Sequence, residues 1–338
     1  MIEGIVFAVL AGTVLGLFAL PEKFTKDFKY ENTWGLFFLI NMIFIPIIAG
    51  VALVNGFGGV LKSLPSDVLV KMLISSFLWG IGMMMWGKAI NHIGLSLGFS
   101  LFIGIIILVG SLLPFILRGL PPTNALVAIL IGIVVVLIGV MANGRAGLIR
   151  SREEKSAGTQ DEEKGSMAKG ILIAVIGGLL ATGFSFASTA GREVIAAACR
   201  EAGNPEWAVG VAVMIVIYFT GGIVTTSYII QQITKKKMWG TFKTPHLSKN
   251  TLMSTLMAIF NFGASVLFGI SVFKLGQLGD TVGYAIFNTM SVAVAIIGGL
   301  LAKEWVNASS KAKTSLYFGL AAMIIGVVII AYGNSLAM

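Results

Sequence analysis

The chain has 338 residues, of which 57% are hydrophobic and only 12% are charged, and its mean hydropathy is +0.93. Soluble domains are about half apolar and about a quarter charged, so this composition excludes an ordinary soluble protein. The net charge of +9 does not indicate nucleic-acid binding, because the basic residues fall between apolar blocks, where membrane topology explains them. The single cysteine, Cys199, excludes an internal disulfide framework.

In chain order, the apolar residues form ten blocks, each close to the roughly 20 residues that a membrane-spanning helix needs. The first five predicted helices lie at residues 3–20, 35–55, 68–90, 93–117 and 124–143. The polar, charged stretch 144–168 follows and cannot bury a core, so it predicts a cytoplasmic linker. The second five predicted helices lie at 170–190, 206–231, 250–273, 279–301 and 314–333. We therefore expect an all-α integral membrane protein with ten transmembrane helices, five in residues 1–143 and five in residues 169–338.

The two halves resemble each other in sequence. Residues Gly4–Gly12 read G-I-V-F-A-V-L-A-G, and residues Gly170–Gly178 read G-I-L-I-A-V-I-G-G. The third helix of each half ends in an aromatic-Gly pair whose glycine is followed seven residues later by another, in Gly87–Gly94 and in Gly269–Gly276. Chance similarity between glycine-rich segments is the alternative. Two repeats of five spans must be inverted relative to each other, and inverted repeats are typical of secondary transporters.

The basic residues predict the orientation. Eighteen of the 24 Lys and Arg residues fall in one set of loops, which includes the linker, and the other 6 fall in the opposite set. Loops rich in Lys and Arg lie in the cytoplasm. We therefore expect a multi-pass protein of the bacterial inner membrane with both termini in the periplasm.

Neutral polar groups and large rings lie within the predicted spans, where polar groups normally face a bundle interior or a wet cavity. A neutral sugar needs amides and hydroxyls for its OH groups and an aromatic ring for its C–H face. The candidate substrate-binding residues are Asn41, Trp79, Trp86, Ser185, Asn261 and Asn288. The alternatives are hydrogen bonds from Ser or Asn to helices and interfacial anchoring or packing of the tryptophans.

Two carboxylates near the predicted outer surface, Glu193 and Asp280, are the candidate proton-coupling residues. Glu193 follows Ser185 and Thr189 at intervals of four residues, so we expect the three to share one helix side, where a partly desolvated carboxylate would bind protons near neutral pH. Asp280 is predicted at a helix N-terminus, which favours its charged form and makes it a poorer carrier, so Glu193 is the preferred candidate. An interfacial Arg192–Glu193 pair and an N-cap Asp280 are the alternatives. We expect no metal site and no cofactor.

Several motifs resemble the L-rhamnose–proton symporter family of the drug/metabolite transporter superfamily. They are W-G-I-G at 79–82, W-G at 86–87, I-G-L-S-L-G at 93–98, L-V-G-S-L at 108–112, E-N-T-W at 31–34 with Pro46 downstream, G-F-S-F-A at 183–187 and K-E-W at 303–305. The resemblance covers almost the whole chain and implies a ten-helix inverted-repeat fold that imports a deoxy sugar with protons. The chain departs from the family pattern at Met83, Met84 and Met85, where polar residues are expected, and at Glu193, where no carboxylate is expected.

We therefore expect a secondary transporter that imports a small neutral sugar, L-rhamnose or a similar deoxy sugar, by proton symport through the lipid bilayer. Alternatives within transport are glucose or ribose uptake, metabolite export and passive facilitation. An integral-membrane enzyme acting on lipid-linked groups is the rival of a different class. Such an enzyme needs a nucleophile, a metal or an acid–base pair near the bilayer surface. The scattered His and Cys residues argue against it, and no nucleic-acid partner is expected.

Overall fold

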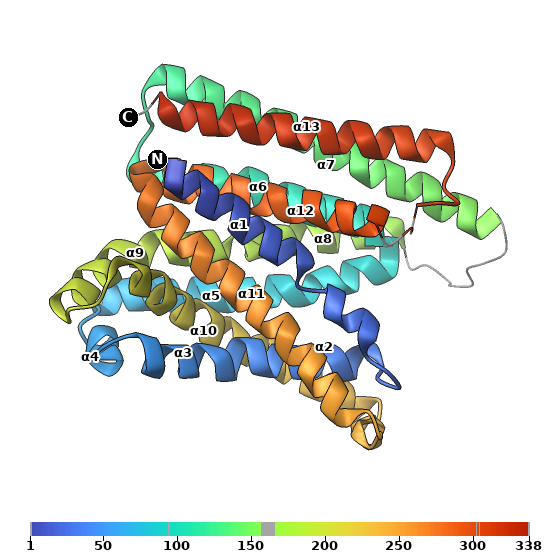
Figure 1. Ribbon diagram of the computed structural model, residues 1–338, viewed down its shortest axis with the longest axis horizontal. Coiled ribbons are helices and arrows are strands. Elements are labelled where there is room, and N and C mark those ends of the chain that lie inside the picture. The colour runs from blue at the N-terminus through green and yellow to red at the C-terminus, as the bar shows by residue number, and fades with distance from the viewer. Residues whose placement is uncertain (1, 94, 157–165, 302, 304, 337–338) are drawn as a thin grey trace.

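The computed structural model describes residues 2–93, 95–156, 166–301, 303 and 305–336, and within them the chain is helical with no strand (Figure 1). Nine helical segments of this described part are long and apolar enough to cross a membrane, and a further apolar segment, Leu101–Ile116, is shorter. The prediction of an all-α, multi-pass membrane protein is confirmed.

The first half contains one long, interrupted rod and four further major helices. Its elements are α1 (Ile2–Leu17), η1 (Leu20–Phe24), α2 (Tyr30–Leu39), the π-helix η2 (Ile40–Phe44), α3 (Ile45–Leu53), α4 (Phe57–Lys62), α5 (Ser66–Ile93), α6 (Leu95–Arg118) and α7 (Thr123–Ser156).

The second half has two interrupted rods, one at α8–α9 and one at the start of α12. Its elements are α8 (Met167–Ala181), α9 (Gly183–Glu201), α10 (Glu206–Lys235), η3 (Trp239–Phe242), α11 (Leu247–Leu275), η4 (Gly276–Leu278), the π-helix η5 (Gly279–Gly283), α12 (Tyr284–Leu301) and α13 (Ser310–Ser335).

The segment predicted as a linker at 144–168 begins as helix. α7 continues through Ser156, because Arg, Glu and Lys are frequent in this stretch and are good helix formers despite their polarity. α8 begins at Met167, so only residues around 157–165 separate the two helices, and these lie outside the described residues. The division of the chain into two repeats at this segment stays a prediction.

The long helices lie side by side, and the start of α1 and the end of α13 lie at the same end of the molecule (Figure 1). α7 and α13 form a close pair along one edge. A Cβ added to Gly139 would lie 2.6 Å from Cγ of Met323 and 2.7 Å from the carbonyl oxygen of Gly319. Small residues permit such contact between helices in lipid.

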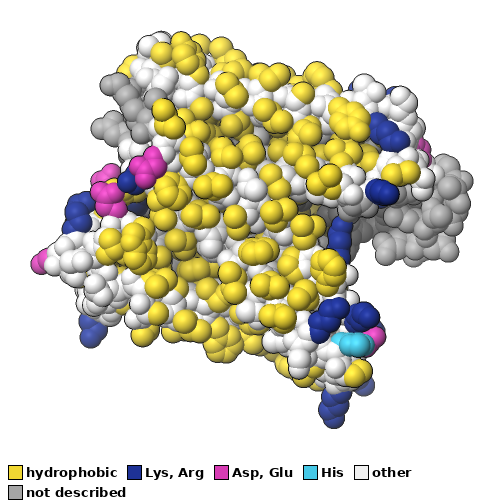
Figure 2. Space-filling view, in the orientation of Figure 1, with side chains coloured by type: hydrophobic (Ala, Val, Ile, Leu, Met, Phe, Trp, Pro, Cys, Tyr) yellow, Lys and Arg dark blue, Asp and Glu magenta, His cyan; other side chains and the backbone are white. Residues whose placement is uncertain are grey.

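The outer surface has the charge distribution of a membrane-spanning protein. Figure 2 shows hydrophobic side chains over the middle of one face and charged side chains gathered at its two ends. Large apolar side chains such as Val51, Ile116 and Val328 are exposed. In a bilayer this band would face the acyl chains, and the charged ends would lie in the headgroup regions.

Candidate functional site

Aromatic side chains from five different elements meet in the core. Trp79 of α5 lies with its ring centroid 5.4 Å from that of Phe184 of α9 and 5.3 Å from that of Tyr218 of α10. Tyr284 of α12 lies 6.2 Å from Phe184 and 5.8 Å from Phe268 of α11. We call Trp79, Phe184, Tyr218, Phe268 and Tyr284 the aromatic cluster. It provides ring faces of the kind that the C–H face of a sugar contacts.

A hydrogen-bonded network adjoins the aromatic cluster at Tyr218. The Asn41 side-chain amide donates to Oδ1 of Asn261 at 2.9 Å, and the Tyr218 hydroxyl donates to the same oxygen at 2.9 Å. The Tyr218 hydroxyl also lies 2.5 Å from Oγ of Ser265. Within the described residues, the buried Oδ1 of Asn41 has no hydrogen-bond partner. The network therefore presents an open acceptor beside an aromatic surface.

Asn41 owes its position to a local break in helical geometry. It lies in η2, where the backbone N–H of Ile45 bonds to the carbonyl of Ile40, five residues earlier. Pro46, which follows, has no N–H to donate to the carbonyl of Met42, so a regular α-helix cannot continue through this segment. Single π-turns of this kind are frequent at functional sites.

The other predicted sugar-binding residues make contacts outside the network. Trp86 is half-buried and packs on α6, with its ring centroid 6.1 Å from that of Phe102. Ser185 donates to the carbonyl of Gly110 at 2.8 Å, and the Asn288 side chain donates to the carbonyl of Tyr284 in its own helix at 2.9 Å. The structure thus brings Asn41, Trp79 and Asn261 together through Tyr218 and binds Ser185 and Asn288 to backbone.

The two candidate carboxylates lie in opposite environments. Oδ2 of Asp280, in η5, is 3.0 Å from Nη2 of Arg192, and the two side chains are 1% and 9% exposed. Glu193 is exposed. The expected common side of Ser185, Thr189 and Glu193 is wrong, since the first two are buried. Eight residues turn an α-helix by about 80° beyond two full turns, whereas the seven from Ser185 to Arg192 fall only about 20° short of them.

The geometry of η5 follows from the glycines before it. α11 ends at Leu275, and Gly276 has φ of +68°, a backbone conformation that side chains with a Cβ rarely adopt. The chain then turns through η4 and enters η5, which places Asp280 in the interior beside α9. The sequence indicated an N-terminal carboxylate here but not that it would be buried.

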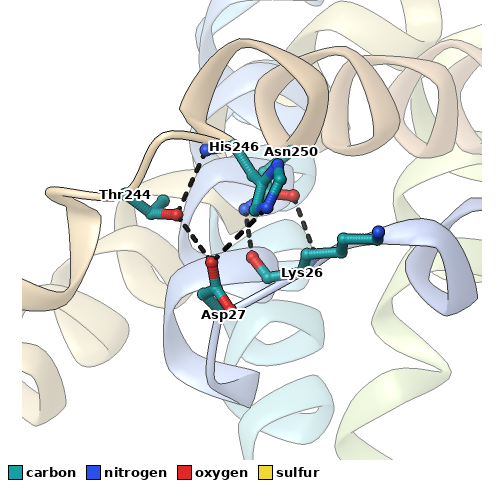
Figure 3. Close-up of polar contacts among 5 residues, drawn as sticks. All are labelled: Lys26, Asp27, Thr244, His246 and Asn250. Atoms are coloured by element: carbon teal, nitrogen blue, oxygen red, sulfur yellow. Dashed lines mark hydrogen bonds and ion pairs between the residues drawn. The ribbon is translucent and has the colours of Figure 1, made fainter.

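The two halves are joined at each end by an asparagine that bonds to backbone of the other half. At one end, the Asn250 side chain donates to the backbone carbonyl of Lys26 at 2.7 Å and accepts from the backbone N–H of Lys26 at 3.0 Å (Figure 3). The neighbouring Asp27 carboxylate accepts from the Thr244 hydroxyl at 3.0 Å and lies 3.8 Å from Nε2 of His246.

The contact at the opposite end has the same form. Asn204 donates to the carbonyl of Asn55 at 2.8 Å and accepts from its N–H at 2.6 Å. Both asparagines are buried, so water does not easily replace the hydrogen bonds that they form between the two halves.

Sequence reasoning missed Phe184, Phe268 and Tyr284 as parts of one site. No spacing within a single helix relates them, because each comes from a different element. In the described part of the chain, no three His, Cys, Asp or Glu side chains come together in a way that could hold a metal ion.

These features define a multi-pass membrane protein whose core is lined by aromatic and amide side chains and contains the buried Arg192–Asp280 ion pair. The sequence model of the family described as "L-rhamnose-proton symport protein (RhaT)" matches residues 1–336, and the chain belongs to that family. The resemblance that the motifs indicated is therefore confirmed.

The names of similar proteins agree with this assignment. The chain is 27% identical over 343 residues to the L-rhamnose-proton symporter of Yersinia pestis (strain Pestoides F), which covers 98% of each chain. It is 26% identical over 339 residues to the protein of the same name from Shigella dysenteriae serotype 1 (strain Sd197), which covers 98% of this chain and 97% of the relative.

Proposed function

We propose that this protein imports a small neutral sugar, L-rhamnose or a similar deoxy sugar, together with protons. The observation that carries the proposal is the family match over residues 1–336, with relatives named L-rhamnose-proton symporter aligned along 98% of the chain. Those names favour a transporter over an enzyme acting on lipid-linked groups. The substrate would bind near the midplane, between the two halves.

The proposed sugar site lies where the aromatic cluster meets the Asn41 network. Trp79 would contact the apolar face of the sugar, and Asn41, Asn261 and Tyr218 would bind its hydroxyls. The open Oδ1 of Asn41 supports this placement, because a buried acceptor without a partner is costly and a sugar hydroxyl would satisfy it.

The remaining predicted residues stay as weaker candidates. Trp86, Ser185 and Asn288 would need to change partner to contact a sugar, since each is packed on another ring or bonded to backbone.

We propose a fold of ten membrane helices in two inverted repeats. The even number is supported by the two chain ends, since a chain whose α1 starts and α13 ends at one end of the molecule crosses an even number of times (Figure 1). α6, whose apolar segment Leu101–Ile116 is shorter than the nine long candidates among the described residues, would be the tenth.

Exchanged contacts between the halves support the repeat. α1 packs on α11 and α12, and α8 packs on the corresponding α5 and α6 of the other half. A Cβ on Gly4 would meet the side chain of Leu275 near the end of α11, and a Cβ on Gly170 would meet that of Ile93 at the end of α5. The glycines that open the repeated sequence thus make equivalent contacts.

The proposed location is the bacterial inner membrane with both termini in the periplasm. The basic asymmetry of 18 residues against 6 supports this orientation. A reporter fused after the last residue tests it: an enzyme that is active only in the periplasm should be active there. Activity of a cytoplasm-specific reporter at the same position would reverse the orientation.

Glu193 and Asp280 remain the proposed proton carriers, and burial now favours Asp280. A carrier must bind a proton on one side and release it on the other, away from free exchange with bulk water. Asp280 is 1% exposed, whereas Glu193 is exposed. Asp280→Asn should abolish uphill accumulation while Glu193→Gln retains it. The reverse result would restore Glu193 as the preferred proton carrier.

Uptake of labelled sugars by proteoliposomes tests the proposed function. A pH gradient of one unit supports about tenfold accumulation if one proton enters with each sugar, because each tenfold ratio corresponds to about 1.4 kcal/mol. L-rhamnose, fucose, glucose and ribose should be compared. Accumulation of L-rhamnose above the outside concentration supports symport. Equilibration without accumulation would indicate a passive facilitator, and no uptake of any of the four would contradict sugar import.

A further inference from the structure

We infer that Arg192 is the positioning partner through which proton binding at Asp280 controls the contact between α9 and the η5–α12 segment. This inference rests on the proposed symport, whose substrate and proton it connects. The deprotonated Asp280 would hold the two elements together through Arg192, and a proton on Asp280 would release them.

The chemistry of the pair makes it suited to this role. Arg192 stays protonated at any physiological pH, so only the carboxyl group can change its charge. The two side chains are 9% and 1% exposed and their charged atoms are 3.0 Å apart, so the two opposite charges compensate each other inside the protein. Removing one charge from a buried pair leaves the other uncompensated and is strongly destabilising. A single proton therefore changes the balance between closed and open arrangements of these elements.

The place of the pair links it to the sugar site. α9 carries Phe184 eight residues before Arg192, about 12 Å along the helix, and α12 carries Tyr284 four residues after Asp280, about 6 Å away. Phe184 and Tyr284 stack at 6.2 Å in the aromatic cluster. The same two elements thus form one side of the cluster and meet again at the ion pair, between the cluster and the end of the molecule proposed as periplasmic.

Other charged groups near this end are poor substitutes for the pair. Lys274 of α11 lies 3.4 Å from Glu3 of α1 and 3.6 Å from Glu206 of α10; the side chain of Lys274 is 33% exposed, and those of the two carboxylates are 61% and 59% exposed. On α9, the remaining charged residues Glu193, Arg200 and Glu201 are exposed. α6 ends at a further charged residue, Arg118. Solvent screens exposed pairs, so they do not oppose a change at Asp280 strongly.

One proton crosses the membrane in each transport cycle. A proton from the outer side binds the Asp280 carboxylate, which becomes neutral, and the attraction to Arg192 falls. The α9–α12 contact loosens, which gives the sugar access to the aromatic cluster. The proton leaves to the cytoplasm with the sugar, and the ion pair re-forms in the empty carrier. Because the ion pair re-forms only after Asp280 has released its proton, the empty transporter returns to the outward-facing state only when Asp280 is deprotonated.

Separate measurements of exchange and accumulation test this inference. Counterflow exchange needs sugar binding and the conformational change of the loaded transporter. Accumulation also needs the empty transporter, with Asp280 deprotonated, to return. Arg192→Gln should keep exchange and reduce accumulation under a one-unit pH gradient from about tenfold to about one. Arg192→Lys keeps the positive charge and should retain part of the accumulation. Lys274→Gln removes the two ion pairs with Glu3 and Glu206 instead, and should accumulate sugar like the unaltered protein.

A second variant covers the case in which Arg192→Gln does not fold. The double variant Arg192→Gln/Asp280→Asn leaves no buried charge in the pair and should fold, exchange sugar and fail to accumulate it. Accumulation by Arg192→Gln or by the double variant at the level of the unaltered protein would overturn the inference. Loss of exchange together with accumulation in the folded double variant would also overturn it, since Arg192 would then be needed for sugar binding itself. Failure of the unaltered protein to transport any sugar would instead contradict the proposed function.

Discussion

The clearest mutational prediction concerns the two tryptophans of α5, which the sequence could not separate. Trp79 lies in the aromatic cluster within 5.4 Å of Phe184 and 5.3 Å of Tyr218, whereas Trp86 packs against Phe102. If Trp79 contacts the sugar, Trp79→Ala removes an anchor worth about 1–3 kcal/mol of binding free energy. The dissociation constant should then rise about tenfold to a hundredfold. Trp86→Ala should change it by less than a factor of about 3.

Stability must be measured beside affinity in this experiment. Trp79 is also a core residue, 8% exposed, so its removal should reduce the free energy of unfolding by about 3–5 kcal/mol. Isothermal titration of the purified protein with L-rhamnose gives the affinity, and thermal unfolding without sugar gives the stability. Trp79→Phe keeps a ring and should recover most of the affinity. A folded Trp79→Ala protein with unchanged affinity, or an equal loss in Trp86→Ala, would refute the assignment of Trp79 to the sugar site.

Three further predictions follow from packing and hydrogen bonding. Tyr218→Phe removes the hydroxyl that donates to Asn261, and should weaken sugar binding and cost about 0.5–1.5 kcal/mol of stability; an unchanged calorimetric titration would remove Tyr218 from the site. Asn250→Ala leaves the backbone of Lys26 without two partners, and hydrogen exchange at that amide should accelerate, whereas unchanged exchange would mean that the link is not formed in solution. Gly82→Ala should lower the melting temperature, because its Cβ would lie 2.6 Å from the backbone of α8, while Gly263→Ala, with nothing within 4 Å, should not; equal melting temperatures would contradict the packing of α5 on α8.

Much of the fold was predictable because lipid imposes simple demands on sequence. A spanning helix must be apolar over about 20 residues, so the apolar blocks of the sequence predict the membrane helices. The end of α7 was not predictable from polarity alone. Polar residues up to Ser156 continue the helix because helix propensity does not require an apolar side chain.

The site was less predictable than the fold. The pairing of Asn41 with Asn261 joins residues 220 positions apart, and the aromatic cluster draws on five elements, so both depend on tertiary packing. The preference for Glu193 rested on its intervals of four residues from Thr189 and Ser185. Because an α-helix has 3.6 residues per turn, positions separated by repeated intervals of four move gradually around the helix. The residue on the buried side is Arg192, next to Glu193, and the partner of Arg192, Asp280, comes from another helix.

Sugar-driven proton movement in proteoliposomes is the direct test of proton symport. Addition of L-rhamnose to the outside, with no imposed pH gradient, should make a lightly buffered medium more alkaline as protons enter with the sugar. If Asp280 alone carries the proton, about one proton should enter with each sugar in the unaltered protein. No proton movement is expected for Asp280→Asn, whose exchange of labelled sugar should persist. L-rhamnose entry without any change in external pH in the unaltered protein would contradict proton symport.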